Sequence, residues 1–144
     1  MICQPNKLSQ YWRDCLNREQ RYAVAHRALD TCITENAEGK VILVEGKRDE
    51  LALRNLGFTG PIEKLNRGWG IEKVVVYIVE NYGSCIVLMD WDRTGGRLQR
   101  RLMDSLTSLD IKPCDELRRA LSKAMKPDTM CVEDLPSFLG EHYP

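Results

Sequence analysis

Two short apolar runs, about 45 residues apart, constrain the fold of this chain more than any other feature. Residues 41–44 precede Glu45, and residues 86–89 precede Asp90 and Asp92. Each run is typical of a buried strand that carries an acid to its C-terminal tip. Strands buried on both faces are typical of open parallel sheets, which bind ligands at the carboxyl edge of the strands. We therefore expect the three acids to meet at one edge of a sheet.

The rest of the chain alternates between strand and helix patterns. Apolar periodicity predicts an N-terminal helix over 7–35, followed by helices over 48–56, 71–82, 94–109, 116–125 and 133–139. Further strands are predicted over 62–65 and 111–114, and the second apolar run extends to 85–90. Segment 71–79 is rich in β-branched residues, but its apolar residues recur with a helical period, so we assign it to a helix. In the helix over 94–109, we expect four leucines to face inward: Leu98, Leu102, Leu106 and Leu109.

This alternation predicts an α/β fold of three layers, Rossmann-like, with a central, mainly parallel sheet of about four strands. Its crossovers should be right-handed. We assign residues 1–39 to an N-terminal helical extension and residues 40–144 to the α/β domain with a short C-terminal helix.

Composition narrows the class of protein. The 21 basic and 21 acidic residues cancel, so any binding of a polyanion must come from a local patch. The six cysteines include no CxxC pair and no zinc-finger spacing, which favours free thiols in a reducing cytosol. Neither a signal peptide nor a run of roughly 18 apolar residues is present. We expect a cytoplasmic protein that does not insert into a membrane.

The carboxylates suggest a metal site. Oxygen ligands from Glu45, Asp90 and Asp92 would suit a hard cation such as Mg²⁺, with Mn²⁺ as an alternative. Glu45 is also a candidate general acid/base. Asp49 has two interpretations, because it could stabilise the N-terminus of the following helix or reach the metal.

Basic residues surround the same predicted edge. At about 100° per residue, four arginines share roughly one third of the circumference of the helix over 94–109. They are interpreted either as phosphate contacts or as a solvated face in which Asp104 pairs with an arginine. Loop 66–70 should border the site. The candidate phosphate and nucleic-acid contacts are Lys47, Arg48, Arg67, Arg93, Arg97, Arg100 and Arg101.

Two motifs resemble those of the Toprim domain, which is found in topoisomerases, DnaG-type primases and several nucleases. They are Val44-Glu45-Gly46-Lys47-Arg48-Asp49 and Met89-Asp90-Trp91-Asp92-Arg93-Thr94-Gly95-Gly96. The resemblance covers about residues 40–125 and extends to small stand-alone Toprim proteins, including primase-like ones and the nuclease that matures 5S ribosomal RNA. It implies a Toprim fold, in which Glu45 acts as general acid/base and Asp90 and Asp92 bind Mg²⁺.

The chain departs from the larger members of that family. No tyrosine has the context of a topoisomerase nucleophile, and 144 residues cannot hold the zinc module and polymerase regions of a primase. We therefore expect a Mg²⁺-dependent protein that acts on phosphodiesters of RNA or DNA, most simply as a nuclease.

Two alternatives stay open. The first is a non-catalytic Toprim module that binds RNA, DNA or a protein partner, with the N-terminal helix as a possible partner surface. The second is a haloacid-dehalogenase-like phosphatase, because Asp90, Asp92 and Thr94 resemble its DxDxT motif. In that case Asp90 would be the nucleophile.

Overall fold

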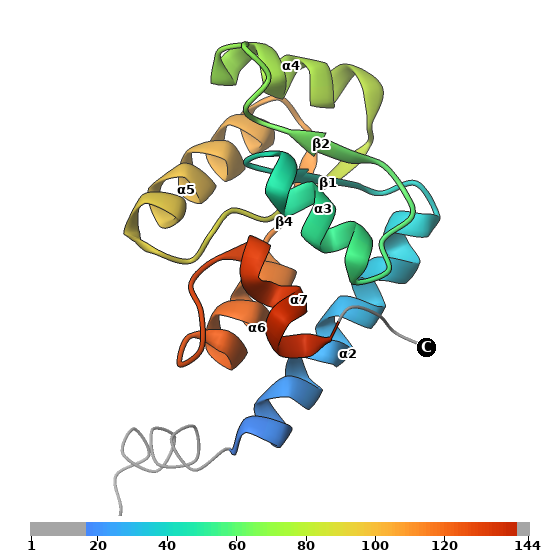
Figure 1. Cartoon of the computed structure of the whole chain (residues 1–144). Helices are drawn as coiled ribbons and strands as arrows, with labels where there is room; N and C mark the ends of the chain where they lie inside the picture. Colours follow the sequence, from blue (N-terminus) through green and yellow to red (C-terminus); the bar gives the residue numbers. More distant parts are fainter. Residues whose placement is uncertain (1–16, 141–144) are drawn as a thin grey trace, which may run out of the picture.

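Four parallel strands form the centre of the computed structural model, which describes residues 17–140 (Figure 1). Their order in the sheet is β2-β1-β3-β4. Ile42 of β1 lies opposite Ile62 of β2 on one side and Ile86 of β3 on the other. The strands span Val41–Val44 (β1), Ile62–Lys64 (β2), Ser84–Val87 (β3) and Lys112–Cys114 (β4). The predicted α/β fold with a parallel sheet of about four strands is confirmed.

Helices cover both faces of this sheet. Because successive side chains of a strand point to opposite faces, Ile42 and Val44 enter one hydrophobic core while Val41 and Leu43 enter another. The first core includes α3 (Lys47–Asn55), α6 (Glu116–Met125) and α7 (Leu135–Leu139). The second includes α4 (Ile71–Asn81) and α5 (Arg93–Ser108), which lie together on one side in Figure 1. These layers explain why the central strand β1 is apolar and buried throughout.

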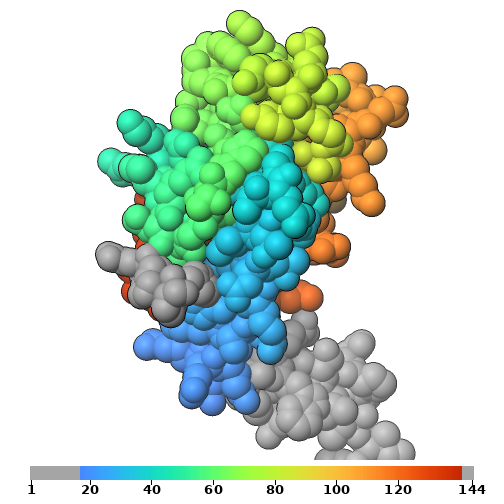
Figure 2. Space-filling model, turned by 90° about the vertical axis from the view of Figure 1, so that its right-hand side faces the viewer, coloured from blue at the N-terminus to red at the C-terminus, as the bar shows by residue number. Residues whose placement is uncertain are grey.

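The N-terminal helix α2 (Arg18–Ala37) joins the first of these cores. Asn17 caps it, since its side chain accepts a hydrogen bond from the backbone N–H of Gln20 at 2.8 Å. Ala25 and Leu29 are fully buried, and α2 packs against α6. In Figure 2 the helix runs through the lower part of the face in view. The predicted helical residues 7–16 lie outside the described part of the chain.

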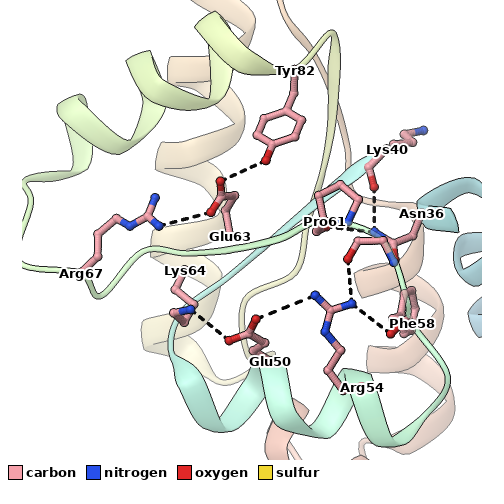
Figure 3. A network of polar contacts seen from close by, with 11 residues as sticks. Asn36, Lys40, Glu50, Arg54, Phe58, Pro61, Glu63, Lys64, Arg67 and Tyr82 are labelled. Atoms are coloured by element: carbon pink, nitrogen blue, oxygen red, sulfur yellow. Dashed lines mark hydrogen bonds and ion pairs between the residues drawn. The ribbon is translucent and has the colours of Figure 1, made fainter. Parts of the chain in front are cut away.

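Buried Asn36 ties α2 to the N-terminal edge of the sheet (Figure 3). Its amide nitrogen donates to the carbonyl oxygens of Lys40 and Pro61, at 2.9 and 3.0 Å. Its amide oxygen accepts from the backbone N–H of Gly60 at 2.7 Å. Arg54 braces the same turn by donating to the carbonyl of Gly60. The end of α2 and the starts of β1 and β2 are therefore held as one unit.

The structure differs from three details of the sequence analysis. The prediction that Leu109 faces inward is wrong, because α5 ends at Ser108 and Leu109 is 44% exposed. In the described residues Asp104 forms no ion pair, and Arg101 instead pairs with Glu72 of α4. The C-terminal helix is divided into a 3₁₀ turn at Val132–Asp134 (η1) and the short helix α7.

The cysteines of the described residues form no disulfide bond. Cys32, Cys85, Cys114 and Cys131 are free thiols, and burial raises the pKa of Cys32 and of Cys85 to about 12. Within residues 17–140, no helix is long and apolar enough to cross a membrane.

Candidate functional site

The carboxyl ends of β1 and β3 meet at the point where the topology of the sheet reverses. These two strands are neighbours, but β1 leads into α3 on one face and β3 leads towards α5 on the other. A crevice opens between such strands, and ligands of open α/β sheets bind there. Glu45 follows β1 and Asp90 follows the extended end of β3. The topology therefore brings both acids to the ligand-binding edge.

The start of α5, together with Gln99 in its second turn, holds the loop that follows β3. Buried Gln99 accepts from the backbone N–H of Met89 at 3.1 Å and donates to the carbonyl of Val87 at 2.8 Å. Asp92 caps α5, since its Oδ1 accepts from the N–H of Gly95 at 2.7 Å. A Cβ atom at Gly95 would collide with the carbonyl oxygen of Asp90, so only glycine fits this close approach.

The C-terminal part of the chain braces the same loop from the other side. Arg118 of α6 donates to the carbonyl of Asp90 at 3.0 Å and to the carbonyl of Met89 at 3.2 Å. The backbone N–H of Val132 donates to Asp90 Oδ1 at 2.9 Å. The indole N–H of Trp91 donates to the carbonyl of Thr129 at 2.7 Å. Two separate segments therefore fix the position of Asp90.

Sequence reasoning missed Arg118. Its partner Asp90 lies 28 residues away, and the arginine belongs to an ordinary amphipathic helix. Burial lowers the pKa of Arg118, while the carboxylates of Asp115, Asp92 and Asp90 act in the opposite direction. Arg118 is thus a cation close to both acids of the DxD motif.

Electrostatics distinguish Glu45 from an ordinary surface acid. Its pKa is raised, first by burial and then by the carboxylates of Asp90 and Asp92. The pKa of Asp90 is also raised by burial; the hydrogen bond from Val132 opposes this, and the charge of Asp92 adds to it. Crowded carboxylates of this kind are stabilised when a cation or a proton joins them.

Asp49 lies beside the carboxylates of Glu45 and Asp90. It makes a contact at the N-terminus of α3, which is the first of the two roles considered for it. As the third residue of α3, it accepts from the N–H of the cap residue Gly46 at 3.1 Å. Burial raises the pKa of Asp49 to about 6, although the Gly46 hydrogen bond lowers it. The charges of Asp90, Glu45 and Glu133 raise it further. Glu133, which sequence reasoning did not place here, belongs to the same electrostatic environment.

The carboxylates share an edge without forming a ligand set. Among residues 17–140, no group of three or more His, Cys, Asp or Glu side chains is arranged to hold a metal ion. One oxygen of Asp90 and one of Asp92 are engaged in hydrogen bonds to backbone N–H groups. Their donor chemistry still fits Mg²⁺, because all of these groups offer hard oxygens. Glu45, Asp90 and Asp92 are the residues that would hold it.

The seven candidate phosphate contacts fall into two sets. Five of them are exposed and form no ion pair within the described residues: Lys47, Arg48, Arg93, Arg97 and Arg100. The other two are engaged. Arg101 pairs with Glu72 at 2.8 Å, and Arg67 pairs with Glu63 at 3.2 Å (Figure 3). A phosphate could meet the first set without breaking an existing contact.

A hollow of about 480 Å³ adjoins the carboxylate edge between α3 and the η1–α7 segment. Arg48 and Glu133 line it, together with Leu51, which is 52% exposed. Charges of both signs therefore border the site on this side.

The fold and this edge define an α/β protein with an open parallel sheet and acids at its switch point. Comparison with known proteins places it further: the chain belongs to the UPF0292 family. It is 36% identical to a UPF0292 protein of Thermococcus onnurineus over 115 residues, covering 79% of this chain and 85% of the relative. It is also 31% identical to a UPF0292 protein of Methanosarcina barkeri, covering 74% of this chain and 73% of the relative.

A solved structure supports the fold. A putative protein from Aquifex aeolicus superimposes with a TM-score of 0.63 and 24% sequence identity, covering 75% of this chain and 94% of that protein. No family model matches the chain.

Proposed function

We propose that this protein is a Mg²⁺-dependent Toprim protein that acts on nucleic-acid phosphodiesters, as a nuclease. The observation that carries the proposal is the placement of Glu45 beside Asp90 and Asp92 at the switch point of the sheet. Burial and like charge raise the pKa of Glu45 there, and a raised pKa favours a carboxyl group that takes up and releases a proton.

The residues around the edge have separable roles in this proposal. Asp90 and Asp92 would hold the metal, which would supply charge stabilisation to the phosphoryl oxygens. Glu45 would accept a proton from the attacking group or give one to the leaving group. The exposed arginines at 93, 97 and 100 would orient the phosphate backbone, since guanidinium groups match phosphate oxygens. Arg118 would keep Asp90 in place through its backbone carbonyl.

Cleavage assays test the proposal. Labelled single-stranded, duplex and structured RNA and DNA would be incubated with Mg²⁺, with Mn²⁺, or with EDTA. We expect metal-dependent cleavage that falls at least about a hundredfold in Asp90→Asn and in Glu45→Gln. Both variants keep side chains of nearly the same shape, so folding should be preserved. Glu80→Gln, an exposed site on α4, is the matched control and should cleave normally.

Cleavage that survives both substitutions would remove this edge from the mechanism. Release of phosphate from a small phosphomonoester, abolished by Asp90→Asn, would instead support the phosphatase interpretation of Asp90, Asp92 and Thr94.

One observation favours a second candidate, the non-catalytic nucleic-acid-binding module. Asp90 and Asp92 each give an oxygen to a structural hydrogen bond, and no ligand set is assembled in the described residues. In this case the acids would position the loop rather than a metal. Salt-dependent binding to nucleic acid, without turnover in either metal, would support this candidate.

A further inference from the structure

An exposed tryptophan borders the carboxylate edge. Trp69 is 36% exposed and lies in loop 66–70, which follows β2. The loop is attached to the tip of β1, because the N–H of Asn66 donates to the carbonyl of Glu45 at 2.8 Å. Gly68 adopts a left-handed conformation with φ of 80°, which turns the chain just before the indole. A large aromatic ring is thus held near the proposed reaction site.

Cations flank this ring. The guanidinium of Arg67 lies 4.6 Å from the centroid of Trp69, and the ammonium of Lys73 lies 4.5 Å from it. The ring of Tyr77 meets Trp69 edge to face at 5.6 Å. Such cation–π contacts hold positive charge close to the aromatic surface.

The two cations differ in mobility. Arg67 is fixed by Glu63, and the other carboxylate oxygen of Glu63 accepts from the hydroxyl of Tyr82 at 3.1 Å (Figure 3). Lys73 is exposed and has no ion pair within residues 17–140. Its flexible stem would let the ammonium leave the ring for a phosphate without breaking a stronger contact.

The start of α4, next to this loop, also contacts the arginine face of α5. Glu72 follows the loop closely and pairs with Arg101 at 2.8 Å. From Arg101 the exposed arginines lead back along α5 to Asp92, over about 14 Å at the rise of an α-helix. Positive charge therefore lies between the carboxylates and the aromatic ring.

We propose that Trp69 is a base-stacking platform for single-stranded nucleic acid, whose backbone follows the arginines of α5 from Trp69 towards Asp92 and Glu45. The inference rests on the proposed function and names its substrate class. An unpaired base would stack on the indole in place of Lys73, and the released ammonium would contact the adjacent phosphate. Exposed aromatics flanked by cations bind single strands in this way, whereas the bases of a duplex are already stacked on one another.

Binding measured without cleavage tests the inference. Fluorescence anisotropy of labelled single-stranded and duplex oligonucleotides, with DNA and RNA arms, would be followed in EDTA. We expect Trp69→Leu to bind single strands of at least one kind roughly tenfold more weakly, and duplex with affinity changed less than about twofold. Trp69→Phe should recover part of the loss. Val76→Ala removes another exposed apolar side chain, on α4, and should bind like the wild type.

A second variant separates stacking from folding. Lys73→Gln leaves the indole in place, and we expect it to reduce the slope of log affinity against log salt by about one unit for single strands. An unchanged slope, or an equal loss of single-strand and duplex affinity in Trp69→Leu, would overturn the inference.

The same data distinguish this inference from the proposed function. If Trp69→Leu binds single strands as tightly as wild type while Asp90→Asn loses cleavage, only the stacking platform is wrong. If the wild-type protein binds no strand at low salt, the proposed function fails and the platform fails with it.

Discussion

The two acid-bearing strand ends differ in how the protein uses their side chains. At the end of β3, Asp90 and Asp92 each accept a backbone hydrogen bond, and Gln99 and Arg118 hold the intervening backbone. At the end of β1, the described structure contains no hydrogen bond to the carboxylate of Glu45. The β3 end is thus strongly constrained, while the β1 end keeps an acid whose raised pKa is not relieved by any donor.

This contrast suits different roles for the ends of β1 and β3 at the same edge of the sheet. A braced loop places its carboxylates at fixed positions, which suits groups that bind an ion. An acid without hydrogen bonds, partly buried beside other acids, has a raised pKa, which suits a role in proton transfer. Substitutions at three positions would break or sharpen the comparison.

The largest effect is expected from Gly95→Ala. The new Cβ would collide with the carbonyl of Asp90, and neither backbone can move away cheaply, so the free energy of unfolding should fall by about 3 kcal/mol. Urea unfolding measures it. The adjacent Gly96→Ala is the matched control: its Cβ would meet only Arg118 Nη2 at 3.5 Å, and the higher helix propensity of alanine should stabilise the protein by up to about 1 kcal/mol. Equal effects at both positions would show that the loop is not tightly held.

Substitutions at Asp92 distinguish the role of its Oδ1 as a helix cap from the role of its negative charge. Asp92→Ala removes the cap of α5 and should cost about 1 kcal/mol of unfolding free energy, whereas Asp92→Asn keeps an acceptor for the Gly95 N–H and should cost only a few tenths. Both should lose metal-dependent cleavage. Full activity in Asp92→Asn would mean that Asp92 serves only as a cap.

The smallest effect is expected in how the free energy of unfolding depends on pH, through Asp49. Its pKa is raised to about 6 in the folded protein, from 3.8, so the folded state holds this proton more tightly than the unfolded state. The resulting stabilisation is complete below about pH 4 and is lost as the pH rises through about 6.

Asp49→Asn should remove that loss. In EDTA, its unfolding free energy relative to wild type should increase by about 1 kcal/mol between pH 4.5 and pH 7.5. Asp104→Asn, at an exposed site on α5, is the control and should show no such trend. A difference between Asp49→Asn and wild type that does not change with pH would contradict the prediction.

Local patterns predicted most elements within one or two residues. The helix predicted over 116–125 is α6 with the same bounds, and the segment rich in β-branched residues is the helix α4, as its periodicity indicated. These predictions succeed because a strand or helix must bury its own apolar face whatever its partners are. Leu109 fails for a local reason, since periodicity does not show where a helix ends.

The candidate site was less predictable. Arg67 was grouped with the phosphate contacts on charge alone, yet the structure pairs it with Glu63 and places it beside two aromatic rings. The hydrogen bonds that Asp90 receives also could not be predicted from the local sequence. Their donors, Val132 and Arg118, lie 42 and 28 residues from Asp90 in the chain.

The sequence by itself determined the identity of the strands, the acids at their tips and the alternation that makes the sheet parallel. It does so because burial and backbone preference act within a few residues of each position. Only the tertiary structure decided that β1 and β3 are neighbours, that α6 and η1 support the DxD loop, and that Arg67 and Lys73 flank Trp69. Those relations arise when both cores close around the sheet, and they bring together side chains from segments whose local patterns are independent of one another.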